Sequence, residues 1–249
     1  MSLAVLDWGI GGVPTWNAIR EQAPNLDTIY ISDSGYAPYG TVPAPQLADR
    51  LRRLSSALMK RGVTQVAVAC NAASVALEQL HDPPCPIVGI IDDGVGIALA
   101  SGAQTIAVLG GEGTIDARVH ERRLRAAGRD VIALPAQTLS AHVEAGRLNG
   151  VVVERDVEAL VVAAAKSDAI LLACTHYPAL TPVFRQFTEA PLLDPCEAFA
   201  RRVCHAAVQN VGQGLHHALT SGDGERTRAA AKRAFGIDLG SVDTLALVL

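Results

Sequence analysis

The chain has 249 residues, of which 49% are hydrophobic and only 4% are aromatic, and its formal net charge at pH 7 is −4. This length suits one large domain or two modest domains with a substantial core. The charge balance, without a basic stripe, argues against a nucleic-acid partner. The sequence has no long apolar run for a membrane helix, and its first residues, MSLAVLDWG, lack the features of a signal peptide. We therefore expect a cytoplasmic protein with no membrane partner.

The five cysteines set a second limit. Their odd number and the lack of a CxxC pair argue against a disulfide framework and against a structural zinc site. The glycines after the first expected strand do not have the spacing of a dinucleotide-binding fingerprint. We therefore expect neither a metal nor a cofactor.

The first expected strand is the apolar run over residues 3–6, which ends at the sequence DWGIGG over 7–12. The glycines allow a tight turn and the close approach of a small ligand. Asp7, at the end of the strand, is a candidate for acid/base chemistry. The alternative is that Asp7 is a solvated loop or helix-cap residue. An Asp at the end of a strand has such a role about half the time.

A second strand is expected over residues 28–32, followed by the loop DSGYAPYG over 33–40, which is too rich in Gly, Pro and Tyr for a regular element. Loops of this kind often carry function. The next segment is predicted to be a helix that ends at Gly62. Its apolar residues recur at helical spacing, and we interpret them only as core: Leu47, Leu51, Leu54 and Leu58.

The third expected strand, over residues 66–69, ends at Cys70, and small residues suited to a tightly packed helix follow to about His81. A further strand is expected over 86–90. In open α/β sheets, ligands bind at the carboxyl ends of strands, where Cys70 would lie. The alternative is a structural role, because free cysteine usually behaves as a small buried hydrophobic residue.

The second half of the chain echoes the first at a nearly constant offset. The apolar runs over 107–109 and 131–133 correspond to the first two strands, and the run over 169–173 is followed by Cys174, in the same context as Cys70. Helices are expected over 156–166 and from 195 to about 219. The segment through TSGD, residues 220–223, would return to the first half.

This pattern predicts an α/β fold with two halves, each built on a mainly parallel sheet, and an active site in the cleft between them. The first domain would comprise residues 1–91 and about 206–249, and the second about 92–205. Each half would supply one cysteine to the cleft.

Two thiols on opposite walls of a cleft suit proton transfer at an acidic carbon. A thiolate can remove a proton from one face of the carbon, and a thiol opposite can return a proton to the other face. Asp7 beside one thiol and His176 beside the other could tune them. For His176, the alternative is a histidine with no role beyond ending a strand.

Short motifs along nearly the whole chain carry a family resemblance. They are DWGIGG from Asp7, PYG from Pro38, ACNAAS around Cys70, GGEGT from Gly110, VEAG from Val143 and CTHYP from Cys174. With them, the chain resembles glutamate racemase and, more broadly, the cofactor-independent aspartate/glutamate racemase superfamily.

The resemblance implies two α/β domains in a pseudo-twofold relation and a mechanism that interconverts L- and D-glutamate through Cys70 and Cys174. Asp7 and His176 would be auxiliary acid/base groups, with Glu144 near the second thiol. D-glutamate would serve peptidoglycan synthesis, and the partners would be the amino-acid substrate and, in a possible homodimer, a second copy of the chain. The residues implied to hold or flank the substrate are Asp7, Trp8, Pro38, Tyr39, Gly40, Asn71, Ala72, Thr114, Thr175 and His176.

The chain departs from the family pattern near the expected pocket. Trp8 and Ala72 stand where the family has Ser and Thr, and Gly111 stands where it often has Thr. In the family these hydroxyl groups are associated with the substrate, and a hydrogen bond to a charged group contributes roughly 1.5–3 kcal/mol. The Trp8 ring would either narrow the pocket or point into the domain core.

The sequence therefore leaves several function classes open. The first is an amino-acid racemase acting on glutamate. The second is an enzyme of the same superfamily with a different, less polar substrate, such as another racemase, an isomerase or a decarboxylase. The third is a binding protein that has lost turnover. The presence of both cysteines favours racemisation over decarboxylation, for which one of the two would suffice.

Overall fold

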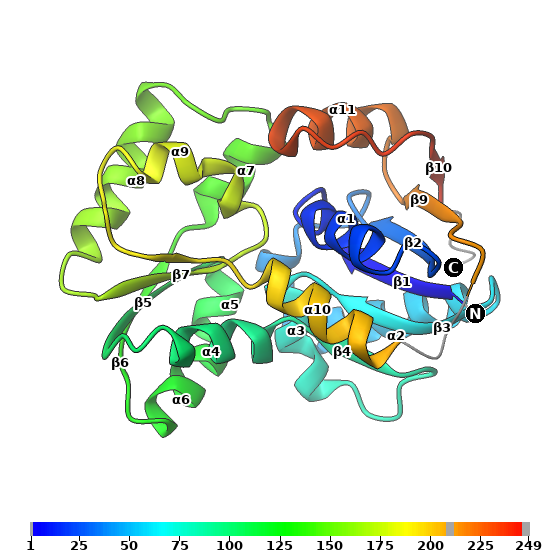
Figure 1. Cartoon of the computed structure of the whole chain (residues 1–249), viewed down its shortest axis with the longest axis horizontal. Coiled ribbons are helices and arrows are strands. Elements are labelled where there is room, and N and C mark those ends of the chain that lie inside the picture. Colours follow the sequence, from blue (N-terminus) through cyan, green and yellow to red (C-terminus); the bar gives the residue numbers. More distant parts are fainter. Residues whose placement is uncertain (1, 208–211, 246–249) are drawn as a thin grey trace.

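The computed structural model describes residues 2–207 and 212–245, and it contains two parallel sheets (Figure 1). The strands are β1 (Ser2–Asp7), β2 (Asp27–Ser32), β3 (Val63–Val68), β4 (Ile87–Gly89), β5 (Thr105–Gly110), β6 (Asp130–Pro135), β7 (Ala169–Ala173), β8 (Leu192–Leu193), β9 (His216–Thr220) and β10 (Val242–Thr244). The first sheet has the order β10-β9-β2-β1-β3-β4, and the second has the order β6-β5-β7-β8.

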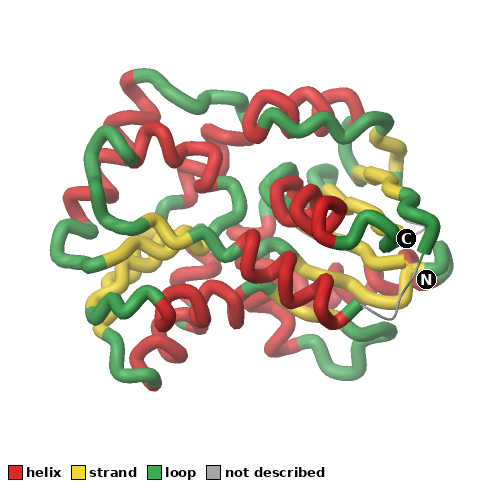
Figure 2. The backbone as a smooth tube through the Cα atoms, in the orientation of Figure 1, coloured by secondary structure: helices red, strands yellow, loops and turns green. Residues whose placement is uncertain are grey.

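Helices lie on both sides of each sheet (Figure 2). The longer ones are α1 (Val13–Gln22), α2 (Ala44–Met59), α4 (Ile91–Ala100), α6 (Val119–Ala126), α7 (Gln137–Glu144), α8 (Val151–Ala163), α10 (Cys196–Ala206) and α11 (Gly224–Phe235). The shorter ones are η1 (Tyr39–Thr41), α3 (Asn71–Ala76), η2 (Leu77–Gln79), α5 (Glu112–Asp116), η3 (Tyr177–Leu180) and α9 (Thr181–Phe184). None of these helices has the length and apolar character needed to cross a membrane.

The two sheets repeat one arrangement of strands. The order β2-β1-β3-β4 in the first sheet matches β6-β5-β7-β8 in the second, and every neighbouring pair is parallel. Strands β9 and β10 extend only the first sheet. The predicted α/β fold with two related halves is confirmed, because the strands with matching sequence offsets occupy matching places.

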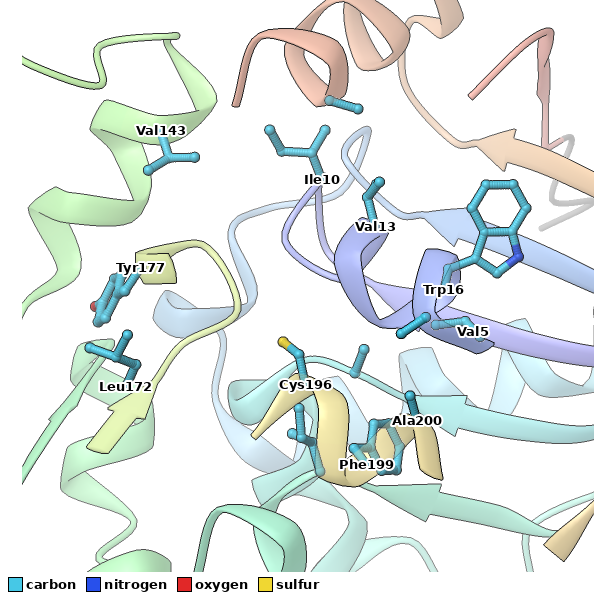
Figure 3. Packing of buried hydrophobic residues seen from close by; sticks show 14 of the residues in the cluster. Val5, Ile10, Val13, Trp16, Val143, Leu172, Tyr177, Cys196, Phe199 and Ala200 are labelled. Atoms are coloured by element: carbon cyan, nitrogen blue, oxygen red, sulfur yellow. The ribbon is translucent and has the colours of Figure 1, made fainter. Parts of the chain in front are cut away.

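The core forms where the sequence places its apolar runs. The apolar residues of β1 are almost fully shielded from solvent, as parallel strands covered by helices on both faces require. On α2, the leucines predicted to face the core are all buried: Leu47, Leu51, Leu54 and Leu58. The largest apolar cluster draws on both halves, with Trp16 and Phe199 on one side and Leu172 and Tyr177 on the other (Figure 3).

The helix α10 links the two halves. It packs against α1, which covers the first sheet, and it also contacts α4, which belongs to the second half. We propose that the sheets mark two domains, with residues 1–91 and about 206–249 in the first and about 92–205 in the second. In that division α10 belongs to the second domain by sequence but packs along the first.

The predicted helix from 195 to about 219 is wrong over its second part. The helix α10 ends at Ala206, and β9 pairs in parallel with β2; residues 208–211 lie outside the described residues. Gly214 has a φ of +71°, a conformation that favours glycine, and Asp27 accepts hydrogen bonds from the backbone N–H groups on either side of it. This turn directs the chain into the first sheet.

Other boundaries also differ from the prediction. The helix expected over 156–166 begins at Val151, after Gly150 with a φ of +96°, and ends at Ala163. The helix after Cys70 ends at Gln79 and the next strand covers only Ile87–Gly89. The helices α1, α4, α6 and α7 were not predicted, because their apolar residues are interrupted by small or polar ones.

A buried histidine lies in the second half, away from the pocket described below. His120 on α6 is 2% exposed, and neither ring nitrogen has a hydrogen-bond partner within the described residues. Burial, assisted by the charge of Arg123, lowers the pKa of His120 to about 4. The folded protein therefore holds this imidazole neutral at a pH where the unfolded chain, with a pKa of about 6.5, would be protonated.

We predict that protonation of His120 weakens the fold in acid. Because the unfolded state binds this proton first, the free energy of unfolding should fall by about 3 kcal/mol as the pH drops from about 6.5 to about 4. Urea unfolding at several pH values measures this. The variant His120→Leu should lose this part of the pH dependence, and His81→Leu, at an exposed histidine, should keep it. An unchanged dependence in His120→Leu would contradict the assignment.

Candidate active site

One pocket lies where the carboxyl ends of strands from both sheets meet. The lining comes from the ends of β1 and β3 in the first sheet and of β5 and β7 in the second, with further residues from η1, α5 and α7. Of the residues predicted for the site, all but Glu144 line the pocket: Asp7, Trp8, Pro38, Tyr39, Gly40, Cys70, Asn71, Ala72, Thr114, Cys174, Thr175 and His176.

The first thiol, Cys70, is paired with a carboxylate. It is the N-cap residue of α3, is 8% exposed, and lies near enough to Asp7 for the carboxylate to affect its pKa. Burial raises the pKa of the Cys70 thiol well above its usual value, and the negative charge of Asp7 acts in the same direction. This surrounding favours the protonated thiol.

Asp7 itself is fully buried at the end of β1. Its carboxylate accepts hydrogen bonds from the Trp8 backbone N–H at 2.6 Å and from the Thr175 hydroxyl at 2.7 Å. Burial raises the pKa of Asp7 above its usual value, while the charge of His176 and the hydrogen bonds from Thr175 and Cys70 oppose this. Because Thr175 follows β7, this carboxylate connects the two halves.

The second thiol, Cys174, is paired with an imidazole. Its Sγ lies 3.8 Å from Nδ1 of His176, and Nε2 of His176 lies 2.7 Å from Oε1 of Glu144. Burial favours the neutral imidazole, but the hydrogen bonds to Cys174 and Glu144 outweigh it and hold the pKa of His176 well above its usual value. A protonated imidazole at His176 therefore adjoins the Cys174 sulfur.

Glu144 lies behind His176 and does not line the pocket. The same Oε1 also accepts the backbone N–H of Ile10 at 3.0 Å, so Glu144 connects α7 to the glycine loop after β1. Burial acts to raise the pKa of Glu144, but the hydrogen bond and charge of His176 lower it overall. Its place makes it a support for His176 and not a group that reaches a ligand.

The glycines of DWGIGG make room for the second half of the protein. A methyl group at Gly9 would overlap the Glu144 carboxylate, and one at Gly11 would overlap the Thr175 hydroxyl and the His176 ring. The close approach predicted from these glycines therefore occurs, but the approaching groups are protein side chains. No ligand is needed to explain them.

The loop that carries Pro38 and Gly40 into the pocket is held by a buried ion pair. Asp33 binds Arg50 through two hydrogen bonds of 2.6 and 2.9 Å and also accepts the Tyr39 hydroxyl at 2.6 Å. The Tyr39 hydroxyl is therefore engaged with Asp33, and the groups it leaves for a ligand are its ring and backbone.

Trp8 contributes its ring to the pocket wall. The indole lines the pocket 6.3 Å from the His176 ring, measured between ring centroids. Its Nε1 donates to the Tyr36 carbonyl at 3.0 Å, so this N–H is already used within the protein. Trp8 also packs against the apolar core of the first half, so its position has features of both orientations considered.

Sequence reasoning missed part of the lining. Besides Gly111, which the family resemblance placed near the pocket, the lining includes Ala173 and, from α7, Gln137 and Ser140. Gln137, Ser140 and Glu144 lie three and four residues apart on one face of the helix, so the VEAG motif together with helical spacing could have located them. Within residues 2–207 and 212–245, no three His, Cys, Asp or Glu side chains are grouped as metal ligands.

Comparisons with known proteins agree with this geometry. The model of the Asp/Glu/Hydantoin racemase family matches residues 21–203. A glutamate racemase of Aquifex aeolicus (strain VF5) is 33% identical over 219 residues, covering 86% of each chain. The structure of glutamate racemase from Aquifex pyrophilus is 27% identical, with a TM-score of 0.83 and 98% of both chains covered.

A second solved structure gives the same result. Glutamate racemase from Thermus thermophilus in complex with beta-chloro-D-alanine is 26% identical, with a TM-score of 0.86, and the match covers 99% of this chain and 97% of the other. The family match extends over most of the sequence, and the structural match extends over nearly all of it. The chain therefore belongs to the Asp/Glu/hydantoin racemase family.

Proposed function

We propose that this protein is a glutamate racemase that moves the α-proton of glutamate between two thiols. The observation that carries the proposal is the pairing of Cys70 with Asp7 and of Cys174 with His176 in one pocket. One thiolate removes the α-proton, which breaks the C–H bond and leaves a carbanion. The other thiol then donates its proton to the opposite face, which gives the enantiomer and exchanges the two sulfur protonation states.

The resting protonation states follow from the neighbours of each thiol. Burial and the Asp7 carboxylate keep Cys70 as a thiol, and Nδ1 of the His176 imidazolium lies 3.8 Å from the Cys174 sulfur. Cys174 is therefore the base for the enantiomer whose α-hydrogen faces it. For the reverse direction, Asp7 receives the proton of Cys70 and His176 gives one to Cys174, so both carry auxiliary acid/base roles.

The substrate is held by groups around the thiols. The Asn71 side chain is 2% exposed, and its amide oxygen and nitrogen have no partner among the described residues, which leaves both for a ligand. Thr114, Thr175 and the backbone of the Tyr39-Gly40 segment provide further polar groups. In a buried site, such groups stabilise the developing carbanion more strongly than water does.

The biological setting is part of the same proposal. The curated relatives compared above are named glutamate racemases, and we infer the same substrate here. D-glutamate would then be supplied to peptidoglycan synthesis in the cytoplasm. A homodimer is the assembly we propose, from the family resemblance alone.

A less polar amino acid is the second candidate substrate. Trp8 places an apolar ring in the pocket wall, and Ala72 lines the pocket without a hydroxyl group. Both features reduce the number of hydrogen bonds that the pocket offers to a carboxylate.

The thiol pair is tested by single substitutions. We predict that Cys70→Ala and Cys174→Ala each lower racemisation by roughly a hundredfold or more, since each face of the α-carbon needs its own acid/base group. In D2O, each variant should exchange the α-proton of one enantiomer only. The enantiomer that Cys70→Ala still exchanges should be the opposite of the one that Cys174→Ala exchanges. NMR of both enantiomers measures this. Cys85→Ala, at a cysteine outside the pocket, is the control, and wild-type racemisation by either site variant would refute the mechanism.

The His176–Glu144 pair is tested by pH. Because Glu144 helps to raise the pKa of His176, Glu144→Gln should lower that pKa and move the alkaline limit of kcat/KM to lower pH. NMR titration of the imidazole and the pH profile of racemisation provide the two measurements. The control is Asp156→Asn, which removes the carboxylate that is hydrogen-bonded to His142, outside the pocket. It should change neither the His176 titration nor the pH profile of racemisation. An unaltered His176 titration in Glu144→Gln would contradict the proposed support.

The effect of Trp8 and Ala72 on glutamate turnover is tested by introducing the residues that the family resemblance implies. The variant Trp8→Ser with Ala72→Thr should raise kcat/KM for glutamate about tenfold, which corresponds to about 1.4 kcal/mol of transition-state binding. Thermal unfolding of the variant controls for the lost hydrogen bond between Trp8 and Tyr36. A stable variant without this gain, beside an efficient wild-type enzyme, would show that these two positions do not limit glutamate turnover.

A further inference from the structure

Gln137, the first residue of α7, lines the pocket in an orientation that its neighbours determine. The Ser140 hydroxyl donates its single proton to the backbone carbonyl of Gln137 at 2.9 Å. Toward the side-chain amide, Ser140 can therefore only accept, and Nε2 of Gln137 donates to it at 3.2 Å. This arrangement directs Oε1 away from Ser140.

The amide oxygen occupies a notch between two glycines. Oε1 of Gln137 is buried and accepts no hydrogen bond from any residue that the structure describes. A Cβ atom at Gly111 would come within 2.7 Å of this oxygen, and one at Gly40 would be in similar conflict with it at 2.5 Å. The amide therefore fills space that both glycines leave open, and a Cβ atom at either position would displace this flexible side chain.

The position of this amide differs from that of the groups around the thiols. Asp7 and His176 adjoin Gly12 and Gly11, in the loop after β1, whereas Gln137 adjoins Gly40 and Gly111. The Tyr177 hydroxyl donates to the carbonyl of residue 136 at 2.8 Å, which ties the start of α7 to the segment that carries Cys174. Gln137 thus lines a different part of the pocket wall from the groups that adjoin Gly11 and Gly12.

We propose that Gln137 is a specificity-determining residue that contacts the side-chain carboxylate of the substrate, in place of the hydroxyl group that Gly111 lacks. Nε2 carries two N–H groups and Ser140 uses one, so the second can donate to the carboxylate. The unpaired Oε1 is an acceptor and would not serve a carboxylate, so the contact depends on the second N–H of Nε2. This inference rests on the proposed racemisation of glutamate.

The exchange between positions 137 and 111 is tested with Gln137→Ala, Gly111→Thr and the double variant. Gln137→Ala should raise KM for glutamate about tenfold with little change in kcat, because the contact is remote from the reacting carbon. Gly111→Thr alone should also raise KM, since its Cβ displaces the amide. The double variant should return KM to within about threefold of wild type, because threonine then has room for its hydroxyl.

Two further variants separate hydrogen bonding from packing. Gln137→Met keeps the length of the side chain without its donor and should raise KM as Gln137→Ala does. Gln186→Ala removes an exposed glutamine and should leave KM unchanged. An unchanged KM in Gln137→Met would overturn the inference, and so would a double variant whose KM is no lower than that of the two single variants. An active wild type would still leave the proposed function intact.

Inactivity of the wild type toward glutamate would instead contradict the proposed function. In that case, the thermal stabilisation of the protein by glutamate decides the role of Gln137. Stabilisation that is weaker in Gln137→Met than in wild type would support the contact. Equal stabilisation of both proteins, or none in the wild type, would overturn it.

Discussion

The buried carboxylate of Asp7 is the constraint on which the arrangement of the protein depends. A carboxylate removed from water is stabilised only when hydrogen-bond donors surround it. One donor, the Trp8 backbone N–H, is adjacent in the chain, but another, the Thr175 hydroxyl, belongs to the second half of the protein. The carboxyl ends of β1 and β7 must therefore meet, and this meeting places the thiols that follow β3 and β7 in one pocket.

The contact between the two halves gives the two thiols different environments. Gly9 and Gly11 allow Glu144, Thr175 and His176 to approach the loop after β1, so the second half brings an imidazole and its carboxylate to that loop. Cys174 then faces a cation, while Cys70 faces the Asp7 anion. Opposite charges beside the two thiols are the arrangement that the proposed proton transfer across a carbon requires.

The departures from the family pattern lie at separate places on the pocket wall. Trp8 stands where the family resemblance implies a serine, and its indole N–H donates to the Tyr36 carbonyl in the loop whose Asp33 binds Arg50. On another part of the wall, Gly111 lacks a side chain where Gln137 fills the space. The pocket thus loses hydroxyl groups at separate positions and gains one amide from a different helix. These departures change parts of the pocket wall, and both thiols are present.

The sequence by itself determined the two-sheet α/β class, the repeat and most of the pocket, because apolar runs followed by Asp7, Cys70 and Cys174 are local patterns and parallel strands bring their carboxyl ends together. Only the tertiary structure decided that β9 is a strand, since its short run of residues pairs with β2, far away in the chain. It also decided that Gln137 lies against Gly111 and that Tyr36 takes the Trp8 indole N–H. These outcomes depend on contacts between distant segments, and no local periodicity encodes such contacts.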